Sequence, residues 1–323
     1  MNAAGARVWG RLLTWLDHDD APRAYARLKR APHGHEDTSK LAPFFSNGHL
    51  NTARAEAAFG QVASRIRASR ILFVPAVLSG IAMKASRLRL VEYLTHQVRQ
   101  LKDDGFDAEI ADIDTGATVS ANGARLAEIL DRHHCPTWIV THSKGGLDTL
   151  DALVAHPRVR RFVDGWVAFQ APFQGSPVAD VACKAPKARR IGASALKLLG
   201  ADPQAICDLT TDERARYLDA NASEIAQLLA EVPVMCVGTA ASKGILPSWP
   251  TLRWMEERGL RNDGLVPIAS TILPGAHYVL LDGLSHGEVA TGGLLSRRKF
   301  EQIDLLKILF ALMLARQTQR VAA

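Results

Sequence analysis

The feature of this sequence that most constrains its fold is a regular alternation of short apolar runs with longer helical segments. The apolar runs have the length expected of buried parallel strands, and they lie at 71–75, 108–113, 137–142, 163–172, 233–240 and 277–283. The segments between and after them place apolar residues at helical spacing, as at 86–105, 121–133, 144–156 and 302–317. This alternation predicts an α/β fold in which a mostly parallel sheet has helices on both faces. Ligands of such sheets bind at the carboxyl ends of the strands, so a site is expected in the loops that follow these runs.

The loop after the run 137–142 carries Thr141-His142-Ser143-Lys144-Gly145, directly before a predicted helix. This is the pattern of a nucleophile elbow, a turn so tight that only small side chains fit two positions on either side of the serine. Gly145 meets this requirement, and Thr141 stands where glycine is usual. Because the turn exposes the serine hydroxyl above the sheet, we predict that Ser143 is a nucleophile. The alternative is an ordinary serine between a strand and a helix.

Two loops farther along the chain contain the partners that such a serine needs. A serine hydroxyl is a weak nucleophile unless a base removes its proton. Asp263 lies in the loop NDGLVP, and His286 lies in the loop LSHGEV after the last apolar run. The order Ser, Asp, His is the order expected for a triad on this kind of sheet. Asp263 would orient the imidazole of His286, which would take the proton of Ser143.

Other residues near these loops leave alternatives open. His277 is the rival base, although it opens the last predicted strand instead of following it. Asp282 and Asp180 are the rival acids. We expect His142 to pack or to form a local hydrogen bond, and we expect the Lys144 side chain at the surface.

A site for acyl transfer also needs backbone N–H groups that stabilise an oxyanion. The N–H of Lys144, the residue after the serine, is the first candidate. The second donor is expected from the loop 75–80, PAVLSG. Val77 is the first choice there, and Ala76 is the second.

At these motifs the sequence resembles the α/β-hydrolase superfamily, and within it the bacterial lipases and lipase-like serine esterases. It also resembles the lipase-like polyhydroxyalkanoate depolymerases. The resemblance covers roughly 70–317 and rests on THSKGG, APFQGSPVAD, AICDLTTDE, NDGLVP and LSHGEV. It implies the α/β-hydrolase fold with an inserted helical lid, and a reaction that requires no cofactor. The chain departs from the family at Pro75-Ala76, where the family usually has His-Gly.

The chain is expected to divide near residue 68. Residues 1–68 are predicted to form an N-terminal helical extension, and residues 69–323 the hydrolase domain. The segment from about 174 to 230 is too long for a simple crossover, so we predict that it is the lid. Trp249 and Trp254 in a second insertion, together with Phe173, are predicted to line an apolar substrate pocket. Buried structural tryptophans are the alternative.

Composition narrows the possible cofactors, partners and location. The four cysteines form no CxxC pair and are predicted to be reduced thiols, with one disulfide left open. The histidine pairs lack further ligands, so no metal site is predicted. The net charge is +6, but no aromatic and basic motif accompanies it, and no nucleic-acid partner is expected. Because there is no recognisable signal peptide or transmembrane segment, we predict a cytoplasmic location, with transient contact to a membrane or lipid interface left open. The oligomeric state is not predicted.

These observations predict a serine hydrolase that cleaves small-molecule, lipid or polyester carboxylic esters through an acyl-enzyme intermediate. Within enzymes, the alternatives are a polyhydroxyalkanoate or other polyester depolymerase, a lactonase or thioesterase, and an acyltransferase, because one fold serves all of these reactions. The alternative of another class is a non-catalytic protein of the same fold that binds a ligand or partner.

Overall fold

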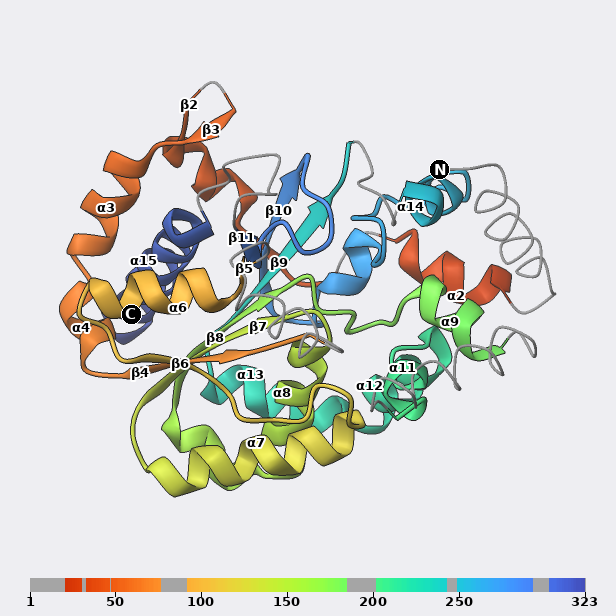
Figure 1. Ribbon diagram of the computed structural model, residues 1–323, viewed down its shortest axis with the longest axis horizontal. Helices are drawn as coiled ribbons and strands as arrows, with labels where there is room; N and C mark the ends of the chain where they lie inside the picture. Colours follow the sequence, from red (N-terminus) through yellow and green to blue (C-terminus); the bar gives the residue numbers. More distant parts are fainter. Residues whose placement is uncertain are drawn as a thin grey trace.

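A seven-stranded sheet lies at the centre of the computed structural model (Figure 1). The model describes residues 21–30, 33–46, 48–76, 92–184, 202–242, 249–292 and 302–322. The strands follow the order β1-β10-β9-β8-β7-β4-β6, and each neighbouring pair is parallel. Their bounds are β1 His35–Glu36, β4 Arg70–Val74, β6 Ala108–Ile110, β7 Thr137–His142, β8 Val163–Phe169, β9 Val234–Ala240 and β10 His277–Asp282. The predicted parallel sheet is therefore confirmed.

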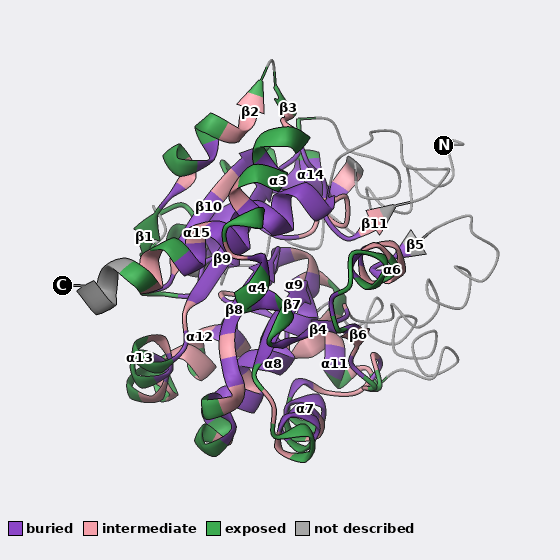
Figure 2. Ribbon diagram, turned by 90° about the vertical axis from the view of Figure 1, so that its left-hand side faces the viewer, coloured by how far each residue is buried: buried purple, intermediate pink, exposed green. Residues whose placement is uncertain are grey.

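The central strands are buried on both faces. Every residue of β4, β7 and β9 is buried, as their continuous apolar sequences predicted. Because side chains alternate along a strand, Ile71 and Phe73 of β4 lie in one hydrophobic cluster, and Leu72 and Val74 lie in the other. Figure 2 shows the buried strands between helices whose outer turns are exposed.

Helices cover the two faces of the sheet (Figure 1). One face packs against α3 (Thr52–Gly60), α6 (Thr95–Asp103) and α15 (Gln302–Ala322). The other packs against α7 (Val119–His133), α8 (Lys144–Ala155) and α13 (Ala222–Glu231).

The remaining described helices are α2 (Ala21–Leu28), α4 (Ala63–Arg67), α9 (Pro177–Lys184), α11 (Gln204–Cys207), α12 (Thr211–Ala220) and α14 (Trp249–Glu256). Three 3-10 turns are η2 (Thr38–Phe44), η3 (Pro157–Phe162) and η4 (Ile268–Thr271). Two short antiparallel pairs join β2 (Phe45–Ser46) to β3 (His49–Leu50) and β5 (Glu92–Tyr93) to β11 (Thr291–Gly292).

The helix predicted at 86–105 is shorter in the structure. Within its described part, α6 occupies only Thr95–Asp103, and Glu92–Tyr93 form β5. Leu94 separates the two elements with a φ of 56°, in the left-handed region. A non-glycine residue in that region interrupts a right-handed helix, which explains the later start of α6.

The segment 35–68 belongs to the core of this fold and is not an appended extension. β1 pairs in parallel with β10 at the edge of the sheet, with His35 opposite His277. Leu41, Phe59 and Ile66 lie in the same hydrophobic cluster as β4. The predicted division at residue 68 therefore does not coincide with a division of the core.

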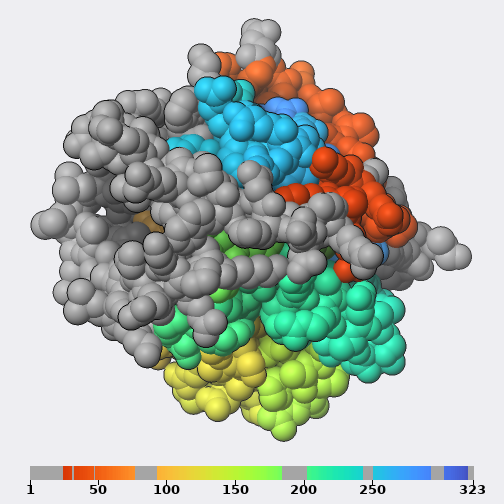
Figure 3. All heavy atoms as spheres, turned by 90° about the vertical axis from the view of Figure 1, so that its right-hand side faces the viewer, coloured from red at the N-terminus to blue at the C-terminus, as the bar shows by residue number. Residues whose placement is uncertain are grey.

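Helix α2 packs against a different part of the chain. Its Tyr25 meets Trp254 of α14 edge to face, with ring centroids 6.2 Å apart. Leu28 belongs to the same small cluster, which Met255 and Leu260 complete. Figure 3 shows α2, in red, lying against the blue surface of α14. Helix α2 thus braces a segment that is distant in sequence.

A core substitution in α3 tests whether the amino-terminal residues belong to the fold. Phe59 is 3% exposed and contacts the rings of Phe106 and Phe310. We expect Phe59→Ala to lower the free energy of unfolding by about 3–5 kcal/mol, as measured by urea denaturation. The exposed Ala57 offers a control, since Ala57→Ser should change stability by less than about 0.5 kcal/mol. Equal stability of the two variants would contradict this packing.

Candidate active site

Ser143 lies on a sharp turn between β7 and α8. Its backbone has φ 55° and ψ −126°, a conformation that is rare for a residue with a side chain. The turn is fixed because the Ser143 N–H donates to the Phe169 carbonyl of the neighbouring strand at 2.9 Å. A Cβ atom on Gly145 would lie 2.7 Å from the Pro75 carbonyl oxygen and still closer to that of Val74. The elbow therefore requires glycine at 145.

Thr141 occupies the other position at which glycine is usual in an elbow. Its hydroxyl accepts a hydrogen bond of 3.0 Å from the indole N–H of Trp166, and both residues are buried. A buried indole N–H needs an acceptor. The threonine supplies one, which gives a physical reason for the departure from glycine.

The structure brings Ser143, His286 and Asp263 together. Nε2 of His286 lies 3.1 Å from the Ser143 hydroxyl, and Nδ1 lies 2.9 Å from a carboxylate oxygen of Asp263. These contacts fit one arrangement of protons, in which Nδ1–H donates to Asp263 and Nε2 accepts from the serine. The three residues come from the loops after β7, β9 and β10, at the carboxyl ends of the strands. Such an arrangement can remove a proton from the serine and stabilise the resulting imidazolium.

The Asp263 carboxylate is held by its own loop. Its side chain is fully buried. Its second oxygen accepts backbone N–H bonds from Leu265 at 3.0 Å and Val266 at 2.8 Å. The His286 N–H in turn donates to the Asp263 carbonyl at 2.8 Å. Because main chain and side chain are both fixed, one carboxylate oxygen stays directed at the imidazole.

The rival acid and base have other partners. Asp282 is exposed and pairs with Arg261. His277 lies at the amino end of β10, where its Nδ1 is 3.2 Å from Asp37. There it lines a pocket of about 240 Å³ together with Arg316. This pocket is at the opposite end of β10 from the His286 loop.

The predicted oxyanion donors lie in two segments, at the start of α8 and after β4. The Lys144 N–H is the first amide of α8, where helix geometry leaves amides without an intrahelical acceptor. The first choice for the second donor, Val77, lies outside the described residues. The second choice, Ala76, donates its N–H to the hydroxyl of Tyr93 at 2.7 Å. The Ala76 amide is thus already engaged.

The Lys144 side chain is not at the surface, contrary to the prediction. It is buried and forms a 2.6 Å ion pair with Asp148, one turn along α8. Asn122 of α7 donates a further bond of 3.0 Å to the same carboxylate. Burial raises the pKa of Asp148 to about 6, against the opposing effects of the Lys144 ammonium and the Asn122 bond. The charge of Lys144 is therefore compensated under the elbow and does not point into the site.

Comparisons with known proteins agree with this architecture. No protein-family model matches the sequence, and no curated protein matches it. Among solved structures, the metagenomic carboxyl esterase MGS0156 is similar with a TM-score of 0.64 and 19% identity, over 77% of this chain and 76% of that chain. The mature form of the Bacillus licheniformis lipase BlEst2 is similar with a TM-score of 0.54 and 21% identity, over 68% of this chain and 85% of that chain. This chain has the α/β-hydrolase fold.

Within this hydrolase fold, His142 forms more than one local bond. Its Nδ1 lies 2.9 Å from the Tyr93 hydroxyl, and its Nε2 lies 3.1 Å from the Gln170 side-chain carbonyl. Burial first, and the nearby His286 second, lower the pKa of His142 to about 3. His142 is therefore neutral beside the base. Sequence analysis did not select Tyr93 or Gln170, although a glutamine directly after an apolar strand is a signal that could have pointed to Gln170.

The predicted apolar pocket is not formed by the described residues proposed for it. Phe173 is completely buried and meets Trp166 edge to face at 5.7 Å. Trp254 is 4% exposed and packs on Tyr25. Trp249 begins α14, and its side chain lies outside the described part. Phe173 packs in the core beside β8, and Trp254 packs between α14 and α2, so both rings have core roles.

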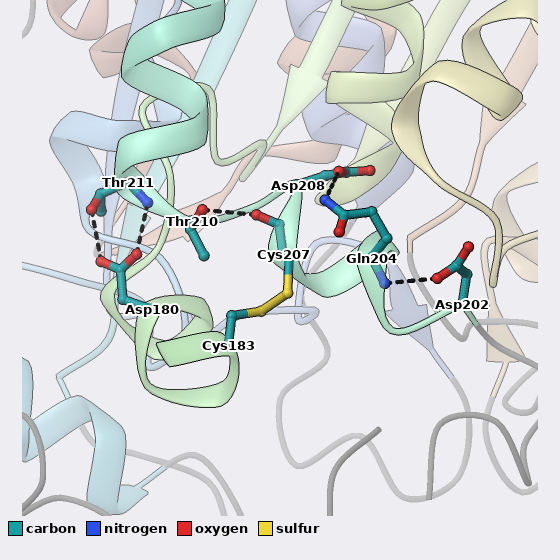
Figure 4. The surroundings of a disulfide bond; sticks show 8 residues. All are labelled: Asp180, Cys183, Asp202, Gln204, Cys207, Asp208, Thr210 and Thr211. Carbon is teal, nitrogen blue, oxygen red and sulfur yellow. Dashed lines mark hydrogen bonds between the residues drawn. A yellow bond between two sulfur atoms is a disulfide. The ribbon is translucent and has the colours of Figure 1, made fainter. Parts of the chain in front are cut away.

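A disulfide joins two helices of the insertion predicted as a lid. Cys183 at the end of α9 is bonded to Cys207 at the end of α11 (Figure 4). The prediction of reduced thiols is therefore wrong for these two cysteines. Cys135 and Cys236 are free. Asp180, the second rival acid, accepts from the backbone N–H and the hydroxyl of Thr211 at 2.9 and 2.7 Å. It thereby caps α12 from a neighbouring helix. Whether the insertion acts as a lid stays a prediction.

The described residues contain no group of three or more histidine, cysteine, aspartate or glutamate side chains that could hold a metal ion. No helix in the described ranges combines the length and apolar character needed to cross a membrane.

The close approach at Gly145 predicts a strong response to one methyl group. We expect Gly145→Ala to lower the free energy of unfolding by roughly 1–3 kcal/mol, because backbone carbonyls cannot easily move away. Gly60, at the end of α3, is a matched control, since a Cβ there would meet nothing within 4 Å. Gly60→Ala should be neutral or stabilising by up to about 1 kcal/mol. Urea denaturation of both variants measures the difference, and a neutral Gly145→Ala would exclude a tight elbow.

The disulfide predicts a stability difference between oxidised and reduced forms. Cys183 and Cys207 are 24 residues apart, and closing such a loop contributes about 3 kcal/mol. We expect the Cys183→Ser/Cys207→Ser variant to lose this amount in urea denaturation without reductant, while Cys135→Ser changes little. Alkylation of the unfolded wild type without reductant should modify Cys135 and Cys236 only. Modification of all cysteines would contradict the disulfide.

The neutral His142 predicts a specific pH dependence of stability. Between about pH 6.5 and pH 3 the unfolded state binds a proton at this residue, and the folded state does not. The free energy of unfolding should therefore fall as the pH falls through this range. We expect His142→Asn to flatten the slope by up to about 1.4 kcal/mol per pH unit, measured by urea denaturation at several pH values. His133→Asn at the exposed end of α7 is the control, and equal slopes for wild type and His142→Asn would contradict the assignment.

Proposed function

We propose that the protein is a serine hydrolase that cleaves carboxylic esters. The observation that carries this proposal is the pair of hydrogen bonds that connects Ser143 to His286 and His286 to Asp263. Ser143 stands on a strained turn at the carboxyl ends of parallel strands, where this class of sheet binds its ligands. Similarity to a carboxyl esterase and a lipase supports ester cleavage.

The reaction follows from the positions of the three side chains. His286 takes the proton of the Ser143 hydroxyl as its oxygen attacks the ester carbonyl carbon. The Lys144 N–H donates to the oxyanion of the tetrahedral intermediate. The intermediate collapses to an acyl-enzyme when His286 gives the proton to the departing alcohol. Water then attacks the acyl carbon, with His286 again as the base, and His286 returns the proton to the Ser143 oxygen as the acid is released.

Asp263 holds the imidazole of His286 in the tautomer that this proton transfer needs. Its carboxylate binds Nδ1–H of His286, so the free lone pair of the imidazole is on Nε2, facing Ser143. When His286 becomes an imidazolium, the buried carboxylate stabilises the positive charge. A protein that only binds a ligand has no need of a base held 3.1 Å from a serine on a strained turn.

Other predictions remain proposals for this enzyme. The insertion 174–230 would act as a lid over an ester that is apolar on its acyl side, and contact with a lipid interface would be transient. A cytoplasmic location also stays a prediction. The disulfide between Cys183 and Cys207 argues against it, because disulfides are more usual in oxidising compartments.

Covalent labelling with a fluorophosphonate tests the proposed function. We expect one adduct on the wild type and none on Ser143→Ala, because the probe reacts only with an activated serine. Ser223→Ala, on the exposed surface of α13, should label like the wild type. Intact mass spectrometry gives the readout. A folded wild type that takes up no probe, even with detergent present, would favour a non-catalytic binding protein.

Ester hydrolysis by an Asp263→Asn variant tests the role of the acid. Asparagine keeps the shape of the side chain but can present an N–H to His286, which favours the wrong tautomer. We expect kcat to fall by about 10⁴-fold. A p-nitrophenyl ester series of increasing acyl length measures this loss in the wild type and the variant. A loss of less than about tenfold would remove Asp263 from the proposed mechanism.

A further inference from the structure

A buried chain of hydrogen bonds runs beneath the candidate site and connects loops that are far apart in sequence. The Ala76 N–H donates to the Tyr93 hydroxyl at 2.7 Å, and this hydroxyl lies 2.9 Å from Nδ1 of His142. Nε2 of His142 continues the chain to the side-chain carbonyl of Gln170 at 3.1 Å. Tyr93, His142 and Gln170 are each at most 4% exposed. The chain therefore links the loop after β4, the elbow and the end of β8.

Gln170 extends this chain to both sides of His286. Its carbonyl oxygen accepts the backbone N–H of Gly287 at 3.0 Å, and its amide nitrogen donates to the backbone carbonyl of Ser285 at 3.1 Å. The same nitrogen donates to the hydroxyl of Thr239 on β9. One side chain thus holds the residue before His286 and the residue after it.

The bonds of the chain fit a single arrangement of protons. The amide nitrogen of Gln170 donates to Ser285 and its oxygen accepts from Gly287, so the ring proton of a neutral His142 is on Nε2 and donates to that oxygen. Nδ1 is then unprotonated and accepts from the Tyr93 hydroxyl, which itself accepts from Ala76. Buried groups that are all satisfied favour one rigid conformation.

The backbone of Gln170 shows that this position is itself held under constraint. Gln170 has a φ of 51°, in the left-handed region that side chains rarely adopt. Its N–H donates to the Val237 carbonyl at 2.9 Å. Strained conformations of this kind persist only where the surroundings determine them, and they often occur at functional sites.

We propose that Tyr93, His142 and Gln170 form a positioning unit that holds the His286 loop and the loop after β4 in register with Ser143. The inference rests on the proposed function, because it assigns the unit a task in the same reaction. Gln170 fixes the main chain around the base, and Tyr93 fixes the amide of Ala76 beside the expected oxyanion donor. His142, which directly precedes Ser143, connects Tyr93 to Gln170.

The unit also sets the charge beside the base. The rings of His142 and His286 are 5.0 Å apart between centroids. A second positive charge at this distance would oppose the imidazolium that His286 forms during the reaction. Since Tyr93 donates to one nitrogen and Gln170 accepts from the other, His142 has no vacant lone pair for a further proton. The unit thus keeps the neighbour of the base neutral while it positions the base.

Steady-state kinetics with an activated ester test the role of Gln170. We expect Gln170→Leu, which leaves an apolar side chain of comparable volume but removes its bonds, to lower kcat by about 10–100-fold and to change KM by less than about twofold. Gln174→Leu is the matched control, because Gln174 also donates its amide to buried carbonyls, at Ala269 and Ile272, but not to the His286 loop. Its kcat should stay within about twofold of wild type. Unchanged kcat in a folded Gln170→Leu would overturn the proposal.

A double-mutant cycle with Tyr93→Phe tests whether the residues act as one unit. Tyr93→Phe keeps the ring and removes only the hydroxyl, so it also serves where Gln170→Leu does not fold. Because the two residues are joined through His142, their effects on kcat should not multiply. Loss in the double variant equal to the product of the single losses would overturn the coupling. If Gln170→Leu does not fold, a wild-type kcat in Tyr93→Phe would itself overturn the proposal.

Imidazole NMR separates this inference from the proposed function. In the wild type at pH 5 we expect a neutral His142 with its proton on Nε2, and a His286 Nδ1–H that is protected by Asp263. Gln170→Leu should broaden or remove the His286 signal, and Gln174→Leu should preserve it. An unchanged His286 signal in Gln170→Leu would overturn the positioning role. A wild type with these signals but no fluorophosphonate adduct would instead contradict the hydrolase function alone.

Discussion

The close contact between α8 and the end of β4 is the constraint on which the site depends. Gly145 brings the helix so near that a Cβ atom would collide with the carbonyls of Val74 and Pro75. This contact forces the chain to turn within one residue, and Ser143 takes the strained conformation that results. The surrounding sheet stabilises the strain, since Ser143 donates its N–H to Phe169 of the next strand. The position of the hydroxyl at the carboxyl ends of the strands is therefore a consequence of packing in the middle of the sheet.

The residues on either side of the serine explain how this turn stays rigid. His142 and Lys144 are both buried, and they form hydrogen bonds in different directions. His142 reaches the loops around the base through Gln170, and Lys144 reaches Asp148 inside α8. A buried ion pair contributes little net stability, but breaking it leaves an uncompensated charge and is costly. The pair therefore resists rotation of the first turn of α8, whose amide faces the attacked carbonyl in the proposed mechanism.

The sequence predicts those parts of the structure that depend on local rules. The strand β7 was predicted at its observed bounds, because a buried parallel strand reads as a continuous apolar run. Ser143, Asp263 and His286 were selected because a tight turn and the order of loops leave a local signature. β1 was missed, since two residues are too few to show a period. The burial of Lys144 was also missed. In the sequence, Lys144 and Asp148 look like an ordinary ion pair on the surface of a helix, and the pair is buried only because α7 covers that face of α8.

Gln170 and Tyr93 illustrate why long-range polar contacts escape prediction. Gln170 bonds to Ser285, 115 positions away along the chain. Tyr93 lies in a segment whose apolar spacing predicted a helix, whereas the structure has β5 there. The spacing of apolar residues predicts which side of a helix is buried, but it does not predict which buried hydroxyl forms a hydrogen bond with which imidazole. Such pairs become visible only after the fold has brought the loops together.

The insertion between β8 and β9 adds a further constraint on the acid. The Ser176 hydroxyl donates to the Leu265 carbonyl at 2.6 Å, and its N–H donates to the Leu209 carbonyl at 2.8 Å. Leu265 also donates to Asp263, so the start of the insertion supports the acid loop directly. The disulfide at Cys207 fixes the same region from the other side. A movement of the insertion that leaves Ser176 in place would keep Asp263 aligned with the imidazole, whereas one that displaces Ser176 would also loosen the carboxylate on which the proposed chemistry depends.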